Sequence, residues 1–543
     1  MKRKITTGTE TREALLRGAD KLCAAVRTVI GPQGRSVLLS GRVGAPDIGH
    51  RAGTVAKQLR FADVTENAGA ILLRSAGEKT AERAGDGAAR AMLLAGELMH
   101  RGNRLIAAGC SPVSLRRGLE RCIPVLLEAL RAQAVTASDG HMLAALASVA
   151  AGDKALGALV AGAFEQVGPE GYVAVKASDT EECRLERVDA FTLERGWSSR
   201  HMATDTVSQE TVFEDAAVFV CETPLSSIYD MLPLLNEVSL SGERLLVLAD
   251  SVADEVIRSF VSNIAQGAIR ICSVSAPGVG QARRDWLADT AAYTGAAVFG
   301  TVERPDLKQA RLSDCGRAGR VVVTRDSTRI ENGRGGELLE RRLKQLRTLQ
   351  RLEHNELEDE QLRRRIANLS GETAVLRIGA VTESERRALS AQAEGALRAV
   401  FDAARNGLVP GGGVAFLRAG SAVRRFAASL PGEERAAGEL LADALEAPCA
   451  LLAANAGHAP GPVLAALKTV EGPMGFDVLT GEITDLLAAG IVDSLGSTIA
   501  AAETGVGLAA QFLTVDAAVL IDGTPVEDLP VPDDLNLSPS DFV

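Results

Sequence analysis

The sequence predicts a multidomain α+β protein in which helical segments from both ends of the chain flank a central α/β segment. The first observation is length, because 543 residues are enough for several domains with sizeable cores. The second is the helical spacing of apolar residues before residue 168 and again after residue 382. The third is an alternation of strand-like and helix-like runs between residues 171 and 324.

Composition narrows the class of protein. Hydrophobic residues make up 46% of the chain and aromatic residues only 3%, which predicts a soluble protein whose helices pack through small side chains. A net charge of −11 gives no reason to expect a nucleic-acid partner. No apolar run is long enough to span a membrane, and the basic start is followed by polar residues rather than a signal-peptide core. We therefore expect a cytoplasmic protein with no membrane partner.

The eight cysteines are widely spaced and include no C-x-x-C pair, which argues against a zinc site or a disulfide framework. Near the N-terminus, residues 11–30 have helical periodicity, the glycine-rich loop Gly31-Pro32-Gln33-Gly34-Arg35 ends this run, and residues 36–39 are strand-like. Helices are expected over residues 111–134 and 141–167.

A second glycine-rich turn, Gly85-Asp86-Gly87, separates apolar helical runs at 67–84 and 88–108. Free N–H groups at a helix start suit a phosphate, and the Asp86 carboxylate suits a divalent cation. The turn is thus interpreted as a nucleotide-phosphate and Mg²⁺ site. The local alternative is a helix corner with an aspartate cap, and the turn alone leaves both open.

The central segment predicts strands and helices in alternation. Strands are expected at 171–175, 216–221, 244–248, 269–274, 297–299 and 320–324, and helices at 226–238, 253–266 and 284–294. Two of these helices share an apolar set that is either core or a groove for apolar peptide: Leu232, Leu235, Ile257, Phe260 and Val261.

The C-terminal part returns to helices. The charged segment 337–368 predicts either a helical hairpin or one long amphipathic helix, followed by a strand at 374–378 and a helix at 382–405. Gly411-Gly412-Gly413 opens the next helix. The chain contains neither a G-x-x-x-x-G-K-[ST] loop nor a strand followed by G-x-G-x-x-G, so the common nucleotide-site motifs are excluded.

The chain resembles the type I (GroEL-like) chaperonins over nearly its whole length. The motifs occur in the family's order and spacing: Leu16-Arg17-Gly18, Gly31-Pro32-Gln33-Gly34-Arg35, Gly44-Ala45-Pro46, Glu66-Asn67-Ala68-Gly69-Ala70, Gly85-Asp86-Gly87, Met231-Leu232-Pro233, Ala276-Pro277-Gly278-Val279-Gly280 and Gly411-Gly412-Gly413.

The resemblance implies a chaperonin fold with three domains. A helix-rich equatorial ATP-binding domain would comprise 1–132 and 407–525, a small α/β intermediate hinge domain 133–189 and 373–406, and an α/β apical polypeptide-binding domain 190–372. It also implies two stacked rings of seven subunits, unfolded polypeptides as partners, and a GroES-like lid co-chaperonin. The content of Pro, Asp and Ser near the end predicts a disordered tail at 526–543.

Carried over by the resemblance, the ATP pocket falls on Val29, Ile30, Gly31, Pro32, His50, Asp86, Gly87, Ala88, Ala89, Arg90, Gly412, Asp477 and Asp493. Asp86 matches the Mg²⁺ ligand, and Asp493 matches a carboxylate that can accept hydrogen bonds from the ribose. The polypeptide site falls on Trp197, His201, Met202, Leu232, Leu235, Ile257 and Val261. His201 and Met202 replace aromatic residues of the family, so the groove is expected to bind apolar segments more weakly or more selectively.

Three departures concern the chemistry of the ATP pocket. Arg51 and Gly395 stand where the family has catalytic aspartates. Arg90 is the last of three residues that follow Gly-Asp-Gly and that replace threonines of the family. Hydrolysis needs a metal and a group that orients water, so turnover is expected to be poor or absent, and no catalytic residue is assigned. Arg51 and Arg90 would bring positive charge to the phosphates and reduce the need for Mg²⁺, which predicts a weakened metal site.

Three functions remain open from the sequence. The first is an ATP-dependent folding chaperonin. The second is a paralogue that binds polypeptide without hydrolysing ATP, or that acts as a regulatory subunit in mixed rings. The third is a scaffold that keeps only the fold. The ATPase rate separates the first from the others, and suppression of client aggregation separates the second from the third.

Overall fold

The structure is a computed structural model that describes residues 2–39, 47–137, 140–178, 180–188, 190–205, 208–353 and 355–522. The motif Gly44-Ala45-Pro46 and the predicted tail 526–543 lie outside the described residues. The chain divides into two compact units, one built from Met1–Ala161 and Arg387–Val543 and the other from Gly162–Arg386.

The first unit is mainly helical and is built from both ends of the chain. Its helices are α1 (Gly8–Thr28), α2 (Ala52–Gln58), α3 (Val64–Ala84), α4 (Ala88–Ala107), α5 (Pro112–Arg131), α6 (Gly140–Ala151), α14 (Val414–Ala427), α15 (Gly432–Ala444), α16 (Ala447–Asn455), α17 (Pro460–Thr469) and α18 (Leu495–Leu513). Helices α7 (Lys154–Val167) and α13 (Glu383–Asn406) contain the two boundaries between the units.

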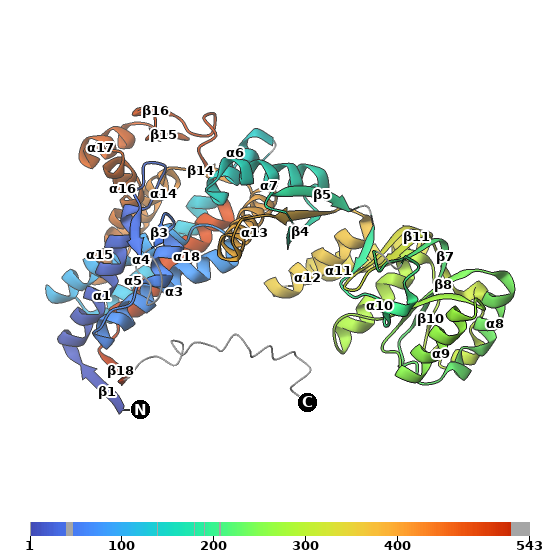
Figure 1. Cartoon of the computed structure of the whole chain (residues 1–543). Coiled ribbons are helices and arrows are strands. Elements are labelled where there is room, and N and C mark those ends of the chain that lie inside the picture. Colours follow the sequence, from blue (N-terminus) through green and yellow to red (C-terminus); the bar gives the residue numbers. More distant parts are fainter. Residues whose placement is uncertain are drawn as a thin grey trace. The chain divides into compact units, whose positions relative to one another are not determined.

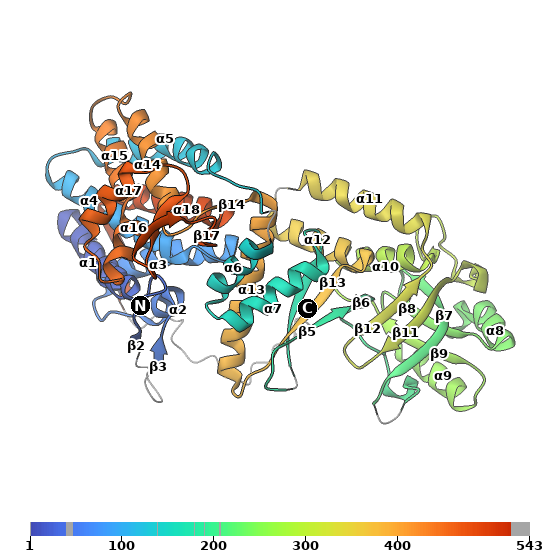
Figure 2. The same cartoon turned by 90° about the horizontal axis from the view of Figure 1, so that it is seen from above.

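Segments distant in sequence form one core in this unit. Helix α18 packs against α3, α4 and α5, and the early and late helices lie side by side in both views (Figures 1 and 2). Strand β1 (Lys2–Thr7) pairs antiparallel with β18 (Ala517–Asp522). Three further two-stranded ladders join β2 (Val37–Leu39) to β3 (Asp47–Gly49), β14 (Leu408–Pro410) to β17 (Val492–Ser494), and β15 (Met474–Asp477) to β16 (Glu482–Asp485).

Small residues set the distance between helices α1 and α3. A Cβ atom on Gly18 would lie 1.7 Å from the Glu66 carbonyl oxygen, and one on Gly69 would lie 1.8 Å from that of Leu15. Only glycine permits so close a backbone approach. The close packing of α1 and α3 therefore requires glycine at these two positions.

The second unit contains a seven-stranded sheet. Its strand order is β6-β12-β11-β7-β8-β9, and β10 also pairs with β7. The strands are β6 (Phe191–Leu193), β7 (Thr211–Cys221), β8 (Arg244–Ala249), β9 (Arg270–Ser275), β10 (Val298–Phe299), β11 (Gly316–Val323) and β12 (Thr328–Gly333).

Helices cover both faces of this sheet, as the predicted layered α/β arrangement requires (Figure 1). Strands β7, β8 and β9 are parallel, and α8 (Leu232–Ser241) and α9 (Asp254–Ala265) are the crossovers between them. Both crossovers lead to the next strand in the same direction along the sheet, from β7 to β8 and from β8 to β9. Helix α10 (Gln281–Thr294) instead leads back to β10, which pairs with β7. Because such crossovers are right-handed, α8 and α9 share one face and α10 lies on the other.

A three-stranded sheet completes the second unit. Strand β13 (Thr373–Ile378) lies between β4 (Tyr172–Ala177), to which it is parallel, and β5 (Arg184–Val188), to which it is antiparallel. Residues predicted to form an intermediate domain thus contribute this sheet to the second unit and helices such as α6 to the first. The three-domain partition stays a prediction.

Two sequence expectations are resolved by the structure. The charged segment 337–368 is a hairpin of α11 (Glu337–Leu352) and α12 (Glu356–Ser370), which pack against each other. The helical pattern expected over 141–167 is confirmed, and it forms two helices because Gly152, with φ at +67°, ends α6 before α7 begins. No helix among the described residues is long and apolar enough to cross a membrane.

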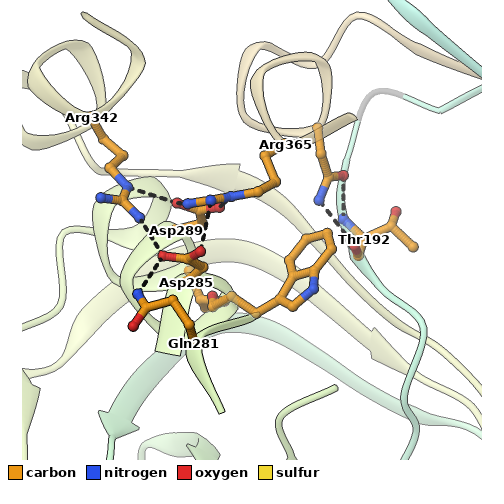
Figure 3. A network of polar contacts seen from close by, with 9 residues as sticks. Thr192, Gln281, Asp285, Asp289, Arg342 and Arg365 are labelled. Carbon is orange, nitrogen blue, oxygen red and sulfur yellow. Dashed lines mark hydrogen bonds and ion pairs between the residues drawn. The ribbon is translucent and has the colours of Figure 1, made fainter. Parts of the chain in front are cut away.

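A buried ion-pair network fixes the α11–α12 hairpin to α10 (Figure 3). The fully buried Asp289 carboxylate accepts hydrogen bonds from Arg342 Nε at 2.7 Å and from Arg365 Nε and Nη2 at 2.6 and 3.0 Å. Asp285 also pairs with Arg365, at 3.0 Å. Three helices therefore depend on one buried carboxylate.

Replacing Asp289 with alanine should lower the free energy of unfolding of the second unit by about 3 kcal/mol, because two partly buried guanidinium groups lose the buried carboxylate that they share and keep only the pairs with Asp285. Both tryptophans, Trp197 and Trp286, lie in this unit, so tryptophan fluorescence during urea unfolding reports on it alone. Arg334→Ala is the control, since the Arg334–Asp215 pair is 66% exposed on both sides and should contribute less than about 0.5 kcal/mol. Equal effects of the two substitutions would contradict the assigned role of the network.

Candidate functional site

The Gly85-Asp86-Gly87 turn joins α3 to α4, as the helical periodicity predicts. Gly85 and Gly87 adopt left-handed conformations with φ of +72° and +91°. Gly87 is the N-cap of α4 and has no side chain to accept hydrogen bonds from the first turn of the helix. The start of α4 therefore keeps free N–H groups and a partial positive charge, which favour an anion.

Arg90, in the first turn of α4, is the centre of a charge cluster. Its Nη2 atom donates to Asp86 Oδ2 at 2.9 Å and to Ser497 Oγ at 2.9 Å, and its Nη1 atom lies 2.5 Å from Asp493 Oδ2. Asp493 belongs to β17 and Ser497 to the first turn of α18. One guanidinium group thus contacts both Asp86, which is assigned to the metal, and Asp493, which is assigned to the ribose.

Burial and the neighbouring charges shift the pKa values of Arg90 and Asp493 in opposite directions. Burial lowers the pKa of Arg90, but the charges of Asp493 and Asp86 outweigh it and hold this pKa above its usual value. Burial raises the pKa of Asp493, although the charge of Arg90 lowers it. Arg90 therefore stays charged and is the main compensation for two neighbouring acids.

The surroundings of Asp86 fit Mg²⁺ poorly, because its Oδ2 atom already accepts a hydrogen bond from Arg90 Nη2 at 2.9 Å. Mg²⁺ in a nucleotide site is bound by one or two carboxylates together with the phosphates, so the pairing of this single carboxylate matters. The described residues contain no group of three or more His, Cys, Asp or Glu residues that could hold a metal ion. A Mg²⁺ ion on Asp86 Oδ2 would lie within about 5 Å of Arg90 Nη2. At an effective dielectric constant of about 20, this implies roughly 7 kcal/mol of repulsion.

Arg51 lies near the same cluster. It is the N-cap residue of α2, and its Nη2 atom donates to the Ala150 carbonyl oxygen at 2.6 Å. Burial lowers the pKa of Arg51, and the charge of Asp86 raises it. A cation therefore stands near Asp86 where the family has an aspartate.

Gly395 lies in α13 against the turn that carries Asp86. A Cβ atom on Gly395 would lie 2.9 Å from the Gly85 carbonyl oxygen, and one on Gly85 would lie 2.3 Å from the Gly395 carbonyl oxygen. The two glycines let the backbones of α13 and the turn touch. An aspartate at position 395 would require one of them to move.

The other residues assigned to the ATP pocket lie in separate local networks. Val29, Ile30, Gly31 and Pro32 follow α1, where Asn455 Nδ2 donates to the Ile30 carbonyl oxygen at 2.8 Å. His50 Nδ1 lies 2.9 Å from Ser36 Oγ. Asp477 accepts a hydrogen bond from the Leu479 N–H at 2.9 Å.

Gly412 and two alanines complete the predicted set. Gly412, with φ at +61°, lies before α14, and a Cβ atom on it would lie 3.9 Å from the carbonyl oxygen of Phe476, the residue before Asp477. Ala88 and Ala89 begin α4 and offer methyl groups in place of hydroxyls. Of the residues assigned to the ATP pocket, the structure brings Asp86, Arg90 and Asp493 into direct contact.

Sequence reasoning missed Ser497 and Asn455. Ser497 accepts a hydrogen bond from Arg90, and Asn455 holds the loop after α1 through two carbonyl groups. Neither residue belongs to a short motif. The only available signal was the spacing of Ser494 and Ser497 at a helix start, which indicates a cap rather than a ligand site.

In the second unit, the predicted polypeptide-binding residues differ in exposure. His201 and Leu232 are exposed, and Trp197, Ile257 and Val261 are partly buried. They lie on or beside α8, α9 and the short helix η1 (Arg200–Met202), which packs against α9. Met202 and Leu235 are only 2% and 6% exposed and belong to the core, so they have almost no surface to offer a client.

Replacing Gly85 with alanine should destabilise the contact between the turn and α13 by about 2–4 kcal/mol, because both the positive φ and the close approach penalise a Cβ atom. Hydrogen exchange of the amides in α3, α4 and α13 measures this change. Gly457→Ala is the control, with φ at +83° and open space around its Cβ position, and should cost only about 1 kcal/mol. Similar exchange in the two variants would show that the close approach does not matter.

The sequence of the chain was compared with those of known proteins. The TCP-1/cpn60 chaperonin family matches residues 22–522. Chaperonin GroEL 5 of Bradyrhizobium diazoefficiens is 37% identical over 526 residues, which cover 96% of this chain and 97% of the relative. The match therefore includes both units and the whole charge cluster around Arg90. On this evidence the chain belongs to the TCP-1/cpn60 chaperonin family, as a GroEL-like type I paralogue.

Proposed function

We propose that this chaperonin binds unfolded polypeptide through its second unit and ATP through its first unit, and that it hydrolyses ATP very slowly or not at all. Membership of the chaperonin family supports a role in protein folding. The observation that carries the proposal is the engagement of Asp86 and Asp493 by Arg90, together with Gly395 in place of an acid.

Slow hydrolysis follows from the groups that the site lacks. In-line attack on a phosphate requires a water molecule held in position and compensation for the developing charge. Gly395 has no side chain to hold water, and Arg51 is a cation that donates to the Ala150 carbonyl group. The loss of one positioned acid or base commonly costs about 10²–10⁴-fold in rate.

ATP binding is supported by positive charge and by free backbone donors. The start of α4 lacks a side-chain cap, and Arg51 and Arg90 bring two guanidinium groups to the same region. When bound, Mg²⁺ would supply charge neutralisation to the phosphates. The carboxylate that would hold it is paired with Arg90, so the proposal includes a weakened metal site.

The assembly is proposed by resemblance to the family. It comprises two stacked rings of seven copies, or mixed rings with a paralogue, in the cytoplasm, with a GroES-like lid as a partner. Two alternative functions remain: a fully ATP-dependent folding chaperonin, favoured by the whole-chain match, and a ring scaffold or regulatory subunit without a client, favoured by the burial of Met202 and Leu235.

Steady-state ATP turnover tests the proposal. We expect the assembled protein to turn over ATP at least about 10²-fold more slowly than a type I chaperonin that retains both aspartates. Gel filtration of the same sample reports on ring formation, which separates an inactive ring from a dissociated chain. Ordinary chaperonin turnover by intact rings would favour the fully ATP-dependent alternative.

Client binding tests the role of the second unit. Leu232→Glu should weaken the binding of an unfolded client about tenfold, because a leucine side chain buried by the client contributes about 1.5 kcal/mol or more. Leu232 is 40% exposed at the start of α8, and Leu240 is 89% exposed near the end of the same helix. Leu240→Glu is therefore a matched control that should leave affinity within about twofold. Suppression of client aggregation is the measurement, and no suppression by the unmodified protein would favour the scaffold.

A further inference from the structure

We infer that Arg90 is a built-in cation that takes the place of the divalent metal at Asp86, so that this site binds nucleotide in its metal-free form. The inference rests on the proposed ATP binding and concerns the chemical form of the ligand. It follows from the disagreement between the donor set and Mg²⁺.

The position of the Arg90 charge is fixed by the fold. Arg90 and Asp86 are four residues apart across the start of α4, and the guanidinium also contacts Asp493 and Ser497 from β17 and α18. A guanidinium held from three elements is present whatever the concentration of free metal. It occupies the contact with Asp86 that a metal ion would need.

Before nucleotide binds, the side-chain charges of the cluster balance without a further cation. Asp86 and Asp493 supply two negative charges, and Arg90 and Arg51 supply two positive charges. A site that still relied on Mg²⁺ would be expected to keep an excess of carboxylate. Here an added divalent ion would compete with Arg90 for Asp86 Oδ2 and would be repelled by the guanidinium group.

Arg90 also keeps a donor for the nucleotide. Its Nη1 atom is buried and pairs with Asp493 Oδ2 at 2.5 Å, so this donor becomes available only when Asp493 is displaced. A phosphate oxygen that reached Nη1 would satisfy this donor in the way that a guanidinium commonly binds phosphate. Asp493 would then be released towards the ribose, so nucleotide entry exchanges one partner of Arg90 for another.

ATP binding to the full-length protein, measured by calorimetry with excess Mg²⁺ and with EDTA, tests the inference. We expect binding in EDTA to be at least as tight as in Mg²⁺, and Arg90→Thr to reverse this preference by about tenfold. Arg74→Thr is the control, because Arg74 is 12% exposed, close to the 14% of Arg90, and forms a pair four residues away with Glu78. A tenfold loss of wild-type affinity in EDTA would overturn the inference and leave the proposed ATP binding intact.

A second measurement needs no nucleotide. Electron paramagnetic resonance measures bound Mn²⁺, and we expect equally little of it in the wild type and in Asp86→Asn. In protein that already carries Arg90→Thr, we expect Mn²⁺ to bind, and the added Asp86→Asn substitution should weaken this binding about tenfold. Mn²⁺ binding by the wild type that depends on Asp86 would overturn the inference even if Arg90→Thr failed to fold. If the wild type bound no ATP in either condition, the proposed ATP binding would fail, and the Mn²⁺ result would still decide whether Arg90 excludes the metal.

Discussion

The charge of Arg90 compensates two acids that the fold places side by side. Asp86 comes from the turn between α3 and α4, and Asp493 comes from β17, more than four hundred residues later in the chain. Without a cation between them, two carboxylates in a partly buried site would repel each other. The guanidinium supplies that cation from within the chain, and it ties together the two halves of sequence that build the first unit.

A second constraint links the turn that carries Asp86 to position 395, where the family has an aspartate and this chain has glycine. Gly85 and Gly395 allow the turn and α13 to meet at backbone distance, so position 395 is both without a carboxylate and without room for one. The replacement of an acid by glycine is therefore part of how the helices pack. The lack of a carboxylate at position 395 and the close packing of α13 against the turn are therefore linked, because a side chain at 395 would require the backbone to move.

Much of the architecture could be predicted from the sequence, because it depends on local patterns. The helices around Gly85-Asp86-Gly87 follow from apolar periodicity, and the parallel core of the second unit follows from alternating strand and helix signals. Strands such as β1 and β18 could not be predicted, since short strands at the ends of a chain become strands only by pairing with each other. The break at Gly152 was missed because alanine and leucine continue on both sides of it.

The sequence predicted which residues belong to the candidate site, but it did not predict which of them contact each other. The resemblance placed Asp86, Arg90 and Asp493 in one pocket, but spacing along the chain cannot say which carboxylate a long flexible side chain will contact. The sequence led us to expect Arg90 to face the phosphates, and the structure shows it paired with the acids. Burial of Met202 and Leu235 was equally hidden, because an apolar side chain on a helix gives no indication of which neighbour covers it.

The most direct test of the central claim is a crystal structure of the protein grown with Mn²⁺ and ATP, with an anomalous difference map calculated at the manganese edge. The account predicts no anomalous peak within coordination distance of Asp86, and a guanidinium that still contacts this carboxylate. A manganese peak on Asp86, with Arg90 turned away from it, would contradict the account.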